Sequence, residues 1–280
     1  MTDILKPVVL ISGCSTGIGR AMALEFAGRG CKVAATARKP AAMKNLESEN
    51  ISLYPLDVTN TKSIKACIKK VNSDLGRIDI LVNNAGYALI GPVAELTMED
   101  LYDQFKTNLF GLIELTQGVL PQMQERKSGK IVNISSVSGI LTTPFGGAYC
   151  ATKAALNSIS DAMRLELAPF GINVITVQPG AVKSNFGNRA SSGIDAYKSE
   201  GSLYSFASKY IEMRAVDSQN NPTKAEVFTA HVADRVLSEN PPAIIRMGRL
   251  SFKLPFFKKF FPVNLLDSML KKRYGLDVKL

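Results

Sequence analysis

Residues 8–19 read VVLISGCSTGIG, and this stretch decides the fold. Its first four residues are apolar, which suits a strand buried on both faces of a parallel sheet. Glycines follow at 13, 17 and 19, where the strand would turn into a helix. Glycine permits a tight turn and a close approach of backbone to phosphate, and a helix N-terminus offers unpaired N–H groups. The stretch therefore predicts a βα unit whose turn binds a nucleotide.

The rest of the chain continues this alternation of strand and helix. Short runs of apolar and β-branched residues predict strands at Val8–Ile11, Lys32–Ala37, Ile51–Leu56, Ile78–Asn83, Lys130–Ser135 and Asn173–Pro179, with a seventh at Ala243–Met247. Helical patterns lie between them, at about 18–29, 61–75, 98–125, 149–169 and 223–239. Such alternation is typical of right-handed βαβ units. We therefore expect an α/β fold, a doubly wound parallel sheet of about seven strands with helices on both faces.

Length and composition favour one globular domain over residues 1–280. No apolar run approaches the roughly 18 residues of a membrane span, and no secretory apolar segment opens the chain. The four cysteines are scattered, which favours reduced thiols and a cytoplasmic location. His231 is the only histidine, so most metal sites and histidine-based proton transfers are excluded, and no metal is expected.

Two segments break the alternation. Residues 181–222 are rich in serine, glycine and asparagine, and a loop at this edge of the sheet is where a substrate lid would lie. Residues 250–280 form a basic, aromatic extension. From Arg246 to the end there are nine lysines and arginines against two acidic residues. Such positive charge can bind a membrane surface or an anionic substrate, or it can simply be exposed to solvent. Nucleic acid is not expected, because no recognition module accompanies the charge.

Four phenylalanines of the extension, with the lysines beside them, suit peripheral contact with anionic lipid. They are Phe256, Phe257, Phe260 and Phe261. Packing of the same rings against the edge of the sheet is the alternative that the sequence leaves open.

A Tyr-x-x-x-Lys pair, Tyr149 and Lys153, supplies the chemistry. Residues four apart on a helix are neighbours. An ammonium beside a phenol favours the phenolate and lowers a pKa that starts near ~10, so the tyrosine can exchange a proton near neutral pH. Ser136 lies thirteen residues earlier. Ser135 adjoins it on a predicted strand, where the two point to opposite faces, and only the spacing selects Ser136.

The end of the second strand bears on the choice of dinucleotide. Proteins that bind NAD place a carboxylate there to bond the ribose 2′-hydroxyl. Residues 35–39 of this chain read ATARK and contain no carboxylate. Arg38 could clamp a 2′-phosphate, so NADP(H) is favoured over NAD(H). Asp57, after the third strand, could accept from the adenine amino group or cap the helix that follows.

Seven motifs stand in the order typical of the short-chain dehydrogenase/reductase family, which the chain resembles over about residues 1–190. They are Gly13-x-x-x-Gly17-Ile18-Gly19, Asp57-Val58, Asn83-Asn84-Ala85-Gly86, Asn108, Ser136, Tyr149-x-x-x-Lys153 and Pro179-Gly180. Ser12 stands where the family usually has threonine. The chain is most similar to the branch with 17β-hydroxysteroid dehydrogenases, retinol dehydrogenases and acyl-dihydroxyacetone-phosphate reductases.

The resemblance implies a Rossmann-type sheet and assigns roles to residues. Ser136 would hold the substrate oxygen, Tyr149 would donate or take the proton, and Lys153 would bond the nicotinamide ribose and tune Tyr149. Asn108 would kink its helix and keep a water in a proton relay. The expected cofactor-binding residues are Gly13, Ser15, Thr16, Gly17, Ile18, Gly19, Arg38, Asp57, Val58, Asn84, Ala85, Gly86, Tyr149, Lys153, Pro179, Gly180, Val182 and Ser184.

The expected function is an NADP(H)-dependent oxidoreductase that interconverts a secondary alcohol and a ketone. The long loop and the aromatic extension favour a lipophilic substrate of steroid, retinoid or acyl-lipid type. A non-catalytic NADPH-binding regulatory protein, or one that associates with membranes, is the alternative. The family resemblance also implies a homodimer or homotetramer, formed through the helices at about 98–125 and 149–169.

Overall fold

Seven parallel strands form the centre of the computed structural model, which describes residues 6–184, 193–199 and 201–279. Their order is β3-β2-β1-β4-β5-β6-β7, so the direction of winding changes between β1 and β4. The strands are β1 (Val8–Ile11), β2 (Lys32–Ala37), β3 (Ile51–Pro55), β4 (Ile80–Asn83), β5 (Gly129–Ile134), β6 (Ile172–Pro179) and β7 (Ile244–Met247). The predicted doubly wound sheet is confirmed, with strand ends within two residues of the prediction.

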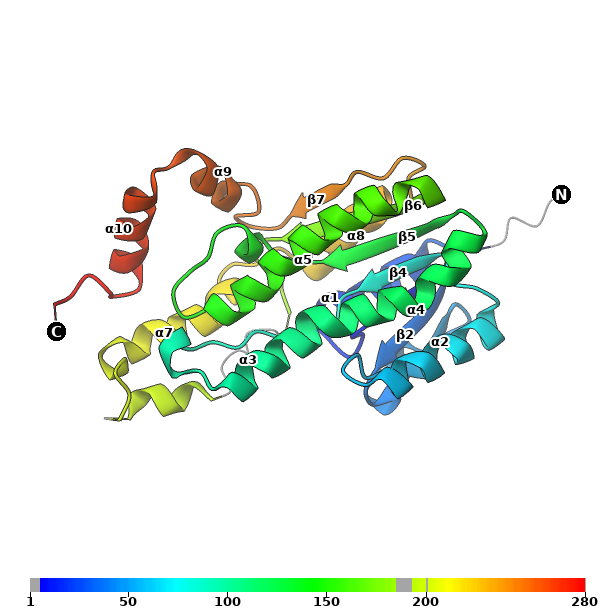
Figure 1. Cartoon of the computed structure of the whole chain (residues 1–280). Coiled ribbons are helices and arrows are strands. Elements are labelled where there is room, and N and C mark those ends of the chain that lie inside the picture. The colour runs from blue at the N-terminus through cyan, green and yellow to red at the C-terminus, as the bar shows by residue number, and fades with distance from the viewer. Residues whose placement is uncertain (1–5, 185–192, 200, 280) are drawn as a thin grey trace.

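Helices cover both faces of this sheet (Figure 1). On one face lie α1 (Gly17–Gly28) and α8 (Ala225–Leu237), which pack against each other. The other face carries α2 (Thr61–Leu75), α4 (Gly111–Glu125) and α5 (Gly147–Glu166). This layering is that of a Rossmann-type α/β protein.

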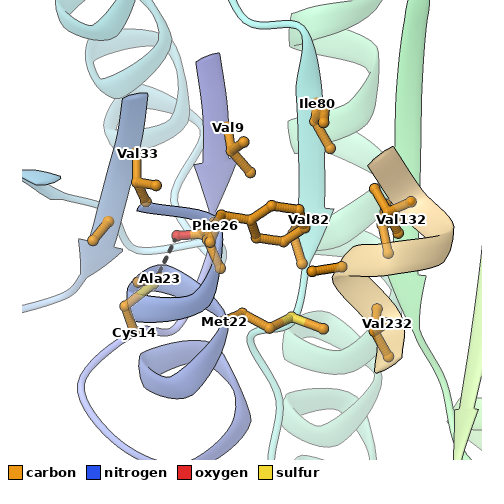
Figure 2. Packing of buried hydrophobic residues seen from close by; sticks show 14 of the residues in the cluster. Val9, Cys14, Met22, Ala23, Phe26, Val33, Ile80, Val82, Val132 and Val232 are labelled. Atoms are coloured by element: carbon orange, nitrogen blue, oxygen red, sulfur yellow. Dashed lines mark hydrogen bonds between the residues drawn. The ribbon is translucent and has the colours of Figure 1, made fainter. Parts of the chain in front are cut away.

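Alternation along each strand supplies one core on each face. Val9 and Ile11 belong to the core beneath α1 and α8, whereas Leu10 between them belongs to the core beneath α2 and α4. Figure 2 shows residues of the first core, among them Phe26 of α1, Val232 of α8 and Val9 of β1. Both faces of β1 are therefore buried, as are both faces of β4, which is why these strands read as continuous apolar runs.

The long helix predicted at 98–125 is interrupted. It consists of α3 (Met98–Phe105), a π-helical turn η3 (Lys106–Phe110) and α4. Short 3₁₀ segments lie at Pro40–Leu46, Val93–Glu95, Val137–Gly139, Ala168–Phe170, Ile194–Lys198, Ser205–Ala207 and Asp217–Gln219. A π-turn inside an α-helix commonly marks a functional site.

Further helices lie in the described parts of the two segments that break the alternation. The expected loop at 181–222 contains α7 (Ser208–Val216) in its described part. The C-terminal extension forms α9 (Lys253–Phe260) and α10 (Val263–Arg273), which stand beside the main body as an arm (Figure 1). Among the described residues, no helix combines the length and the apolar character needed to span a bilayer.

Candidate functional site

The glycine turn lies at the carboxyl end of β1, beside the change of winding. Gly13 and Gly17 have φ angles of +77° and +60°, which disfavour other residues. A Cβ on Gly13 would lie 3.0 Å from the Cα of Ala85, so the turn and the end of β4 are in close contact. The turn leads directly into α1, whose N-terminal N–H groups suit a pyrophosphate.

Asn84 locks this turn to the strand beside it. Its Nδ2 donates to the carbonyl oxygens of Ser12 and Gly13, at 2.9 and 3.2 Å. In return, the Ser12 Oγ accepts from the backbone N–H groups of Asn84 and Ala85, at 2.9 and 3.0 Å. Ser12, noted in the sequence only as a replacement for threonine, is thus the hub of the lock. Gly19 completes it, because a Cβ there would come within 2.4 Å of both the Asn84 amide and the Gly13 carbonyl.

A cavity of about 1040 Å³ opens at this edge of the sheet. Most of the predicted site residues line it: Gly13, Ser15, Thr16, Gly17, Ile18, Arg38, Asp57, Val58, Asn84, Ala85, Gly86, Ser136, Tyr149, Lys153, Pro179, Gly180, Val182 and Ser184. Gly19 and Asn108 do not line it and support residues that do. Its volume exceeds that of a site for a small ligand alone, so a dinucleotide and a substrate can share it.

Ser136, Tyr149 and Lys153 come together on the wall of the cavity, all at least nine-tenths buried. A hydrogen bond joins the side chains of Ser136 and Tyr149. The backbone N–H of Ser138 donates to the Ser136 Oγ at 3.0 Å and fixes that hydroxyl. The Lys153 Nζ lies 5.9 Å from the centre of the Tyr149 ring and donates to the Ile134 carbonyl at 2.7 Å. Ser135 turns elsewhere, and its Oγ donates to the Lys153 carbonyl at 3.2 Å.

Burial has the largest influence on the pKa values of Tyr149 and Lys153. It raises the pKa of Tyr149 to about 12, although the hydrogen bond with Ser136 opposes the rise. Burial also lowers the pKa of Lys153 to about 8. The sequence analysis expected the ammonium to lower the pKa of the phenol. That expectation does not hold here, because burial is the largest cause of the shift, and the positive charge that acts to lower the pKa is that of Arg214 and not that of Lys153.

Asn108 lies in the π-helical turn η3 and is fully buried. Its Oδ1 accepts from the Tyr87 N–H at 3.0 Å, and its Nδ2 donates to the Tyr87 carbonyl at 2.8 Å and to the Thr152 hydroxyl at 3.2 Å. These contacts tie the irregular turn to the segment after β4 and to the helix of Tyr149. The interruption of the helix agrees with the kink that the family resemblance implied.

At the far end of the cavity, Arg38 follows β2 and is exposed. Asp57 follows β3. Its burial acts to raise its pKa, but hydrogen bonds from the Thr59 N–H and hydroxyl, with the charge of Arg38, lower it overall. The suggestion that Asp57 caps the next helix is wrong. Asn60 is the N-cap of α2, and its Oδ1 accepts from the Ser63 N–H at 3.0 Å.

The structure also adds residues that sequence reasoning missed. Gln219 holds the segment that follows Gly180, since its Oε1 accepts from the Ser184 N–H at 2.9 Å and its Nε2 donates to the Val182 carbonyl at 3.2 Å. Tyr274, from the C-terminal arm, is buried among aromatic and aliphatic side chains that include Tyr149. The aromatic, basic composition of the arm was a signal, but nothing local indicated that it returns to the cavity.

This arrangement can bind phosphates at one end and exchange a proton with an oxygen at the other. Comparison with known proteins agrees. Residues 7–195 match the family model described as short chain dehydrogenase. A 3-ketodihydrosphingosine reductase of Bacteroides thetaiotaomicron is 33% identical over 275 residues, which cover 96% of this chain and 98% of that protein.

Two solved structures extend the comparison to the fold. A short-chain dehydrogenase from Streptomyces avermitilis is 32% identical, with a TM-score of 0.81 over 98% of this chain and 100% of that one. A serine dehydrogenase complexed with NADP⁺ is 28% identical, with a TM-score of 0.75 over 87% of this chain and 95% of that one. The matched motifs, the sheet and these likenesses together establish that the chain belongs to the short-chain dehydrogenase family.

Proposed function

We propose that this protein is an NADP(H)-dependent oxidoreductase that interconverts a secondary alcohol and a ketone. The observation that carries the proposal is the grouping of Ser136, Tyr149 and Lys153 on the wall of a cavity that also reaches the glycine turn. A reduction needs a hydride donor, a proton donor and a group that binds the oxygen. Bound NADPH supplies the hydride, and the chain supplies the other two.

Each side chain then has a distinct task. The Tyr149 hydroxyl donates its proton to the ketone oxygen during reduction and takes it back during oxidation. Ser136, oriented by the Ser138 N–H, donates a hydrogen bond to the same oxygen. Lys153 holds the ribose and, when charged, favours the phenolate that forms as the proton leaves. Asn108 fixes the turn beside this group and supports the relay that returns a proton to Tyr149.

The preference for NADP(H) rests on charge at the adenosine end. Arg38 and Lys39 both lie exposed on the cavity wall, after a strand that ends without a carboxylate. A guanidinium can grip a 2′-phosphate by two hydrogen bonds. The NADP⁺ complex of the serine dehydrogenase adds support from a relative.

A lipophilic ketone suits the other end. Tyr149 belongs to an apolar cluster, and its neighbours Ala88, Ile90 and Ala215 also line the cavity. Described residues of the loop 181–222, among them Arg214 and Ala215, also line the cavity. This loop is held where Glu95 accepts from the Ser202 hydroxyl and the Leu203 N–H, both at 2.7 Å. The relative named as a 3-ketodihydrosphingosine reductase supports a ketone substrate.

Membrane contact is a second proposal, favoured by the surface of the arm. Phe252, Phe256 and Phe260 are 67%, 53% and 60% exposed, with lysines around them. Exposed aromatic rings beside lysines suit the interface of an anionic bilayer. We expect binding to phosphatidylserine vesicles at low salt that is lost at high salt and in a Phe256→Ser/Phe260→Ser variant. Val227→Ser, which removes an exposed side chain of α8, is the control. No sedimentation with the vesicles at low salt ends this proposal.

Assembly into a homodimer or homotetramer is proposed through α3, α4 and α5. Tyr102 of α3 and Phe110 of the π-helical turn η3, which leads into α4, expose 65% and 54% of their surface. Light scattering at micromolar concentration measures the state, and a monomer there would refute the proposal.

The direct test of the activity is NADPH oxidation against a panel of steroid, retinoid, acyl-lipid and small ketones. Turnover of a lipophilic ketone, faster with NADPH than with NADH, is the expected result. NADPH binding without turnover of any ketone would favour the alternative, a regulatory NADPH-binding protein.

A further inference from the structure

Arg214 lies on the wall of the cavity at the substrate end, in α7, and the mechanism above does not use it. Its side chain is half-buried, and its Nε donates to the Thr143 hydroxyl at 2.8 Å. The guanidinium also packs closely on the backbone before α5, since a Cβ on Gly146 would lie 2.8 Å from its Nη2. Arg214 is therefore held in place on the segment that leads to Tyr149.

The charge of Arg214 acts on the hydroxyl of Tyr149. Among the causes that set the pKa of the Tyr149 hydroxyl, after burial and the bond with Ser136, the charge of Arg214 acts to lower it. An anion bound by this guanidinium would thus lie a short distance from a carbonyl held by Tyr149 and Ser136.

Arg214 lacks an anionic partner among the residues that the structure describes. Within residues 6–184, 193–199 and 201–279 it forms no ion pair with a carboxylate, and its one side-chain hydrogen bond is that to Thr143. Asp217 is the acidic residue nearest in sequence on this wall, and it is already engaged. It pairs with Arg273 at 2.8 Å and accepts from the Tyr274 hydroxyl at 3.1 Å. A half-buried guanidinium without a counter-ion is a site for an anion.

The neighbouring wall has the same sign. Arg249 also lines the cavity, and its Nη1 donates to the Asn220 carbonyl at 2.6 Å. Among the described residues that line the cavity, the acidic ones are Asp57, which follows β3, and Asp217, whereas Arg214, Arg249 and Arg273 all line it. A ligand that enters past these residues meets excess positive charge, which favours an acidic over a neutral molecule.

We propose that Arg214 binds an acidic group of the substrate, a carboxylate, phosphate or sulfonate, and so selects ketones that carry such a group near the carbonyl. The proposal rests on the proposed function and refines its substrate class. The two free guanidinium nitrogens, Nη1 and Nη2, would donate to the anion, while Nε remains bonded to Thr143. The apolar remainder of the substrate would lie against the aromatic cluster around Tyr274.

The test compares a 4-oxo fatty acid with its methyl ester, which differ in charge and keep the same ketone and chain. The wild-type protein should prefer the acid. Arg214→Gln should lower kcat/KM for the acid by roughly 10- to 100-fold through KM, because a hydrogen bond to a charged group is lost. It should change the value for the ester less than about threefold. Arg214→Lys should restore part of the loss, and Arg235→Gln, on the exposed surface of α8, should change neither.

A structural role for Arg214 predicts another pattern. Equal losses for acid and ester in Arg214→Gln, or a wild-type protein that does not prefer the acid, would overturn the proposal and leave the proposed function standing. Calorimetry of the acid binding to the NADP⁺-loaded protein tests the opposite case, in which the anion site exists but the proposed activity does not. If neither ketone is reduced but the acid binds the wild type and not Arg214→Gln, the anion site stands and the activity fails. If the acid binds both equally, the anion site fails.

Discussion

Replacement of Lys153 by methionine gives a measurable cost for the buried cation of the site. The ammonium is 5% exposed, and burial lowers its pKa from 10.5 to about 8. Each pKa unit corresponds to about 1.4 kcal/mol, so holding the charge in the folded protein costs about 3 kcal/mol near neutral pH. Loss of the hydrogen bond to the Ile134 carbonyl offsets about 1 kcal/mol of this in the variant.

The sign of the pH dependence follows from the direction of the shift. The folded-state pKa lies below the unfolded one, so between about pH 8 and 10.5 the unfolded state binds more protons and wild-type stability gains as pH rises. Below pH 8 both states carry the proton, and the cost is present in full. Relative to Lys153→Met, the wild type should therefore gain about 3 kcal/mol between pH 7 and 10.5.

Urea unfolding followed by circular dichroism, at half-unit steps from pH 7 to 10.5, measures this difference. Other titrating groups are common to both proteins and cancel. A difference for Lys153→Met that stays constant from pH 7 to 10.5, or a wild type that loses stability relative to the variant as pH rises, would refute the reasoning.

Three further changes test separate parts of the site. Arg38→Ser should weaken NADPH binding roughly 10- to 100-fold and leave NADH binding unchanged in fluorescence titrations, and equal effects on both would remove Arg38 from the choice of cofactor. Gly19→Ala should lower unfolding free energy by about 1–3 kcal/mol, because its Cβ would clash with Asn84 and Gly13, and an unchanged melting curve would contradict the lock. Tyr274→Ala should cost about 3–5 kcal/mol, since this side chain is 1% exposed, and a loss below 1 kcal/mol would mean that the arm does not pack there.

Much of the fold could be predicted because it depends on local pattern. The strand β1 and the glycine turn after it were found from apolar residues and glycines that lie next to one another in sequence. Strands β1 and β2 have the predicted bounds, since a strand buried on both faces differs sharply from its polar flanks. Most residues predicted for the site line the cavity, and they were named from short motifs that carry the family resemblance.

The sequence could not predict features that depend on distant contacts. The break at η3 was expected at Asn108 only through the family resemblance, because the hydrogen bonds that hold this residue go to Tyr87 on another segment. Capping of α2 was considered for Asp57, as an alternative to contact with adenine, and not for Asn60, because both residues suit a cap and only the geometry separates them. The raised pKa of Tyr149 was missed, since a Tyr-x-x-x-Lys spacing contains no information on burial. The place of Tyr274 beside the cavity likewise depends on how the arm folds back.

Proton transfer by Tyr149 is the central claim of this account, and Tyr149→Phe tests it most directly. The variant keeps the ring and removes the hydroxyl that is hydrogen-bonded to the Ser136 side chain. NADPH affinity, measured by fluorescence titration, should stay within about threefold of wild type, while kcat for ketone reduction should fall by roughly 10²- to 10⁴-fold. A variant that binds NADPH and reduces the ketone at the wild-type rate would contradict the account.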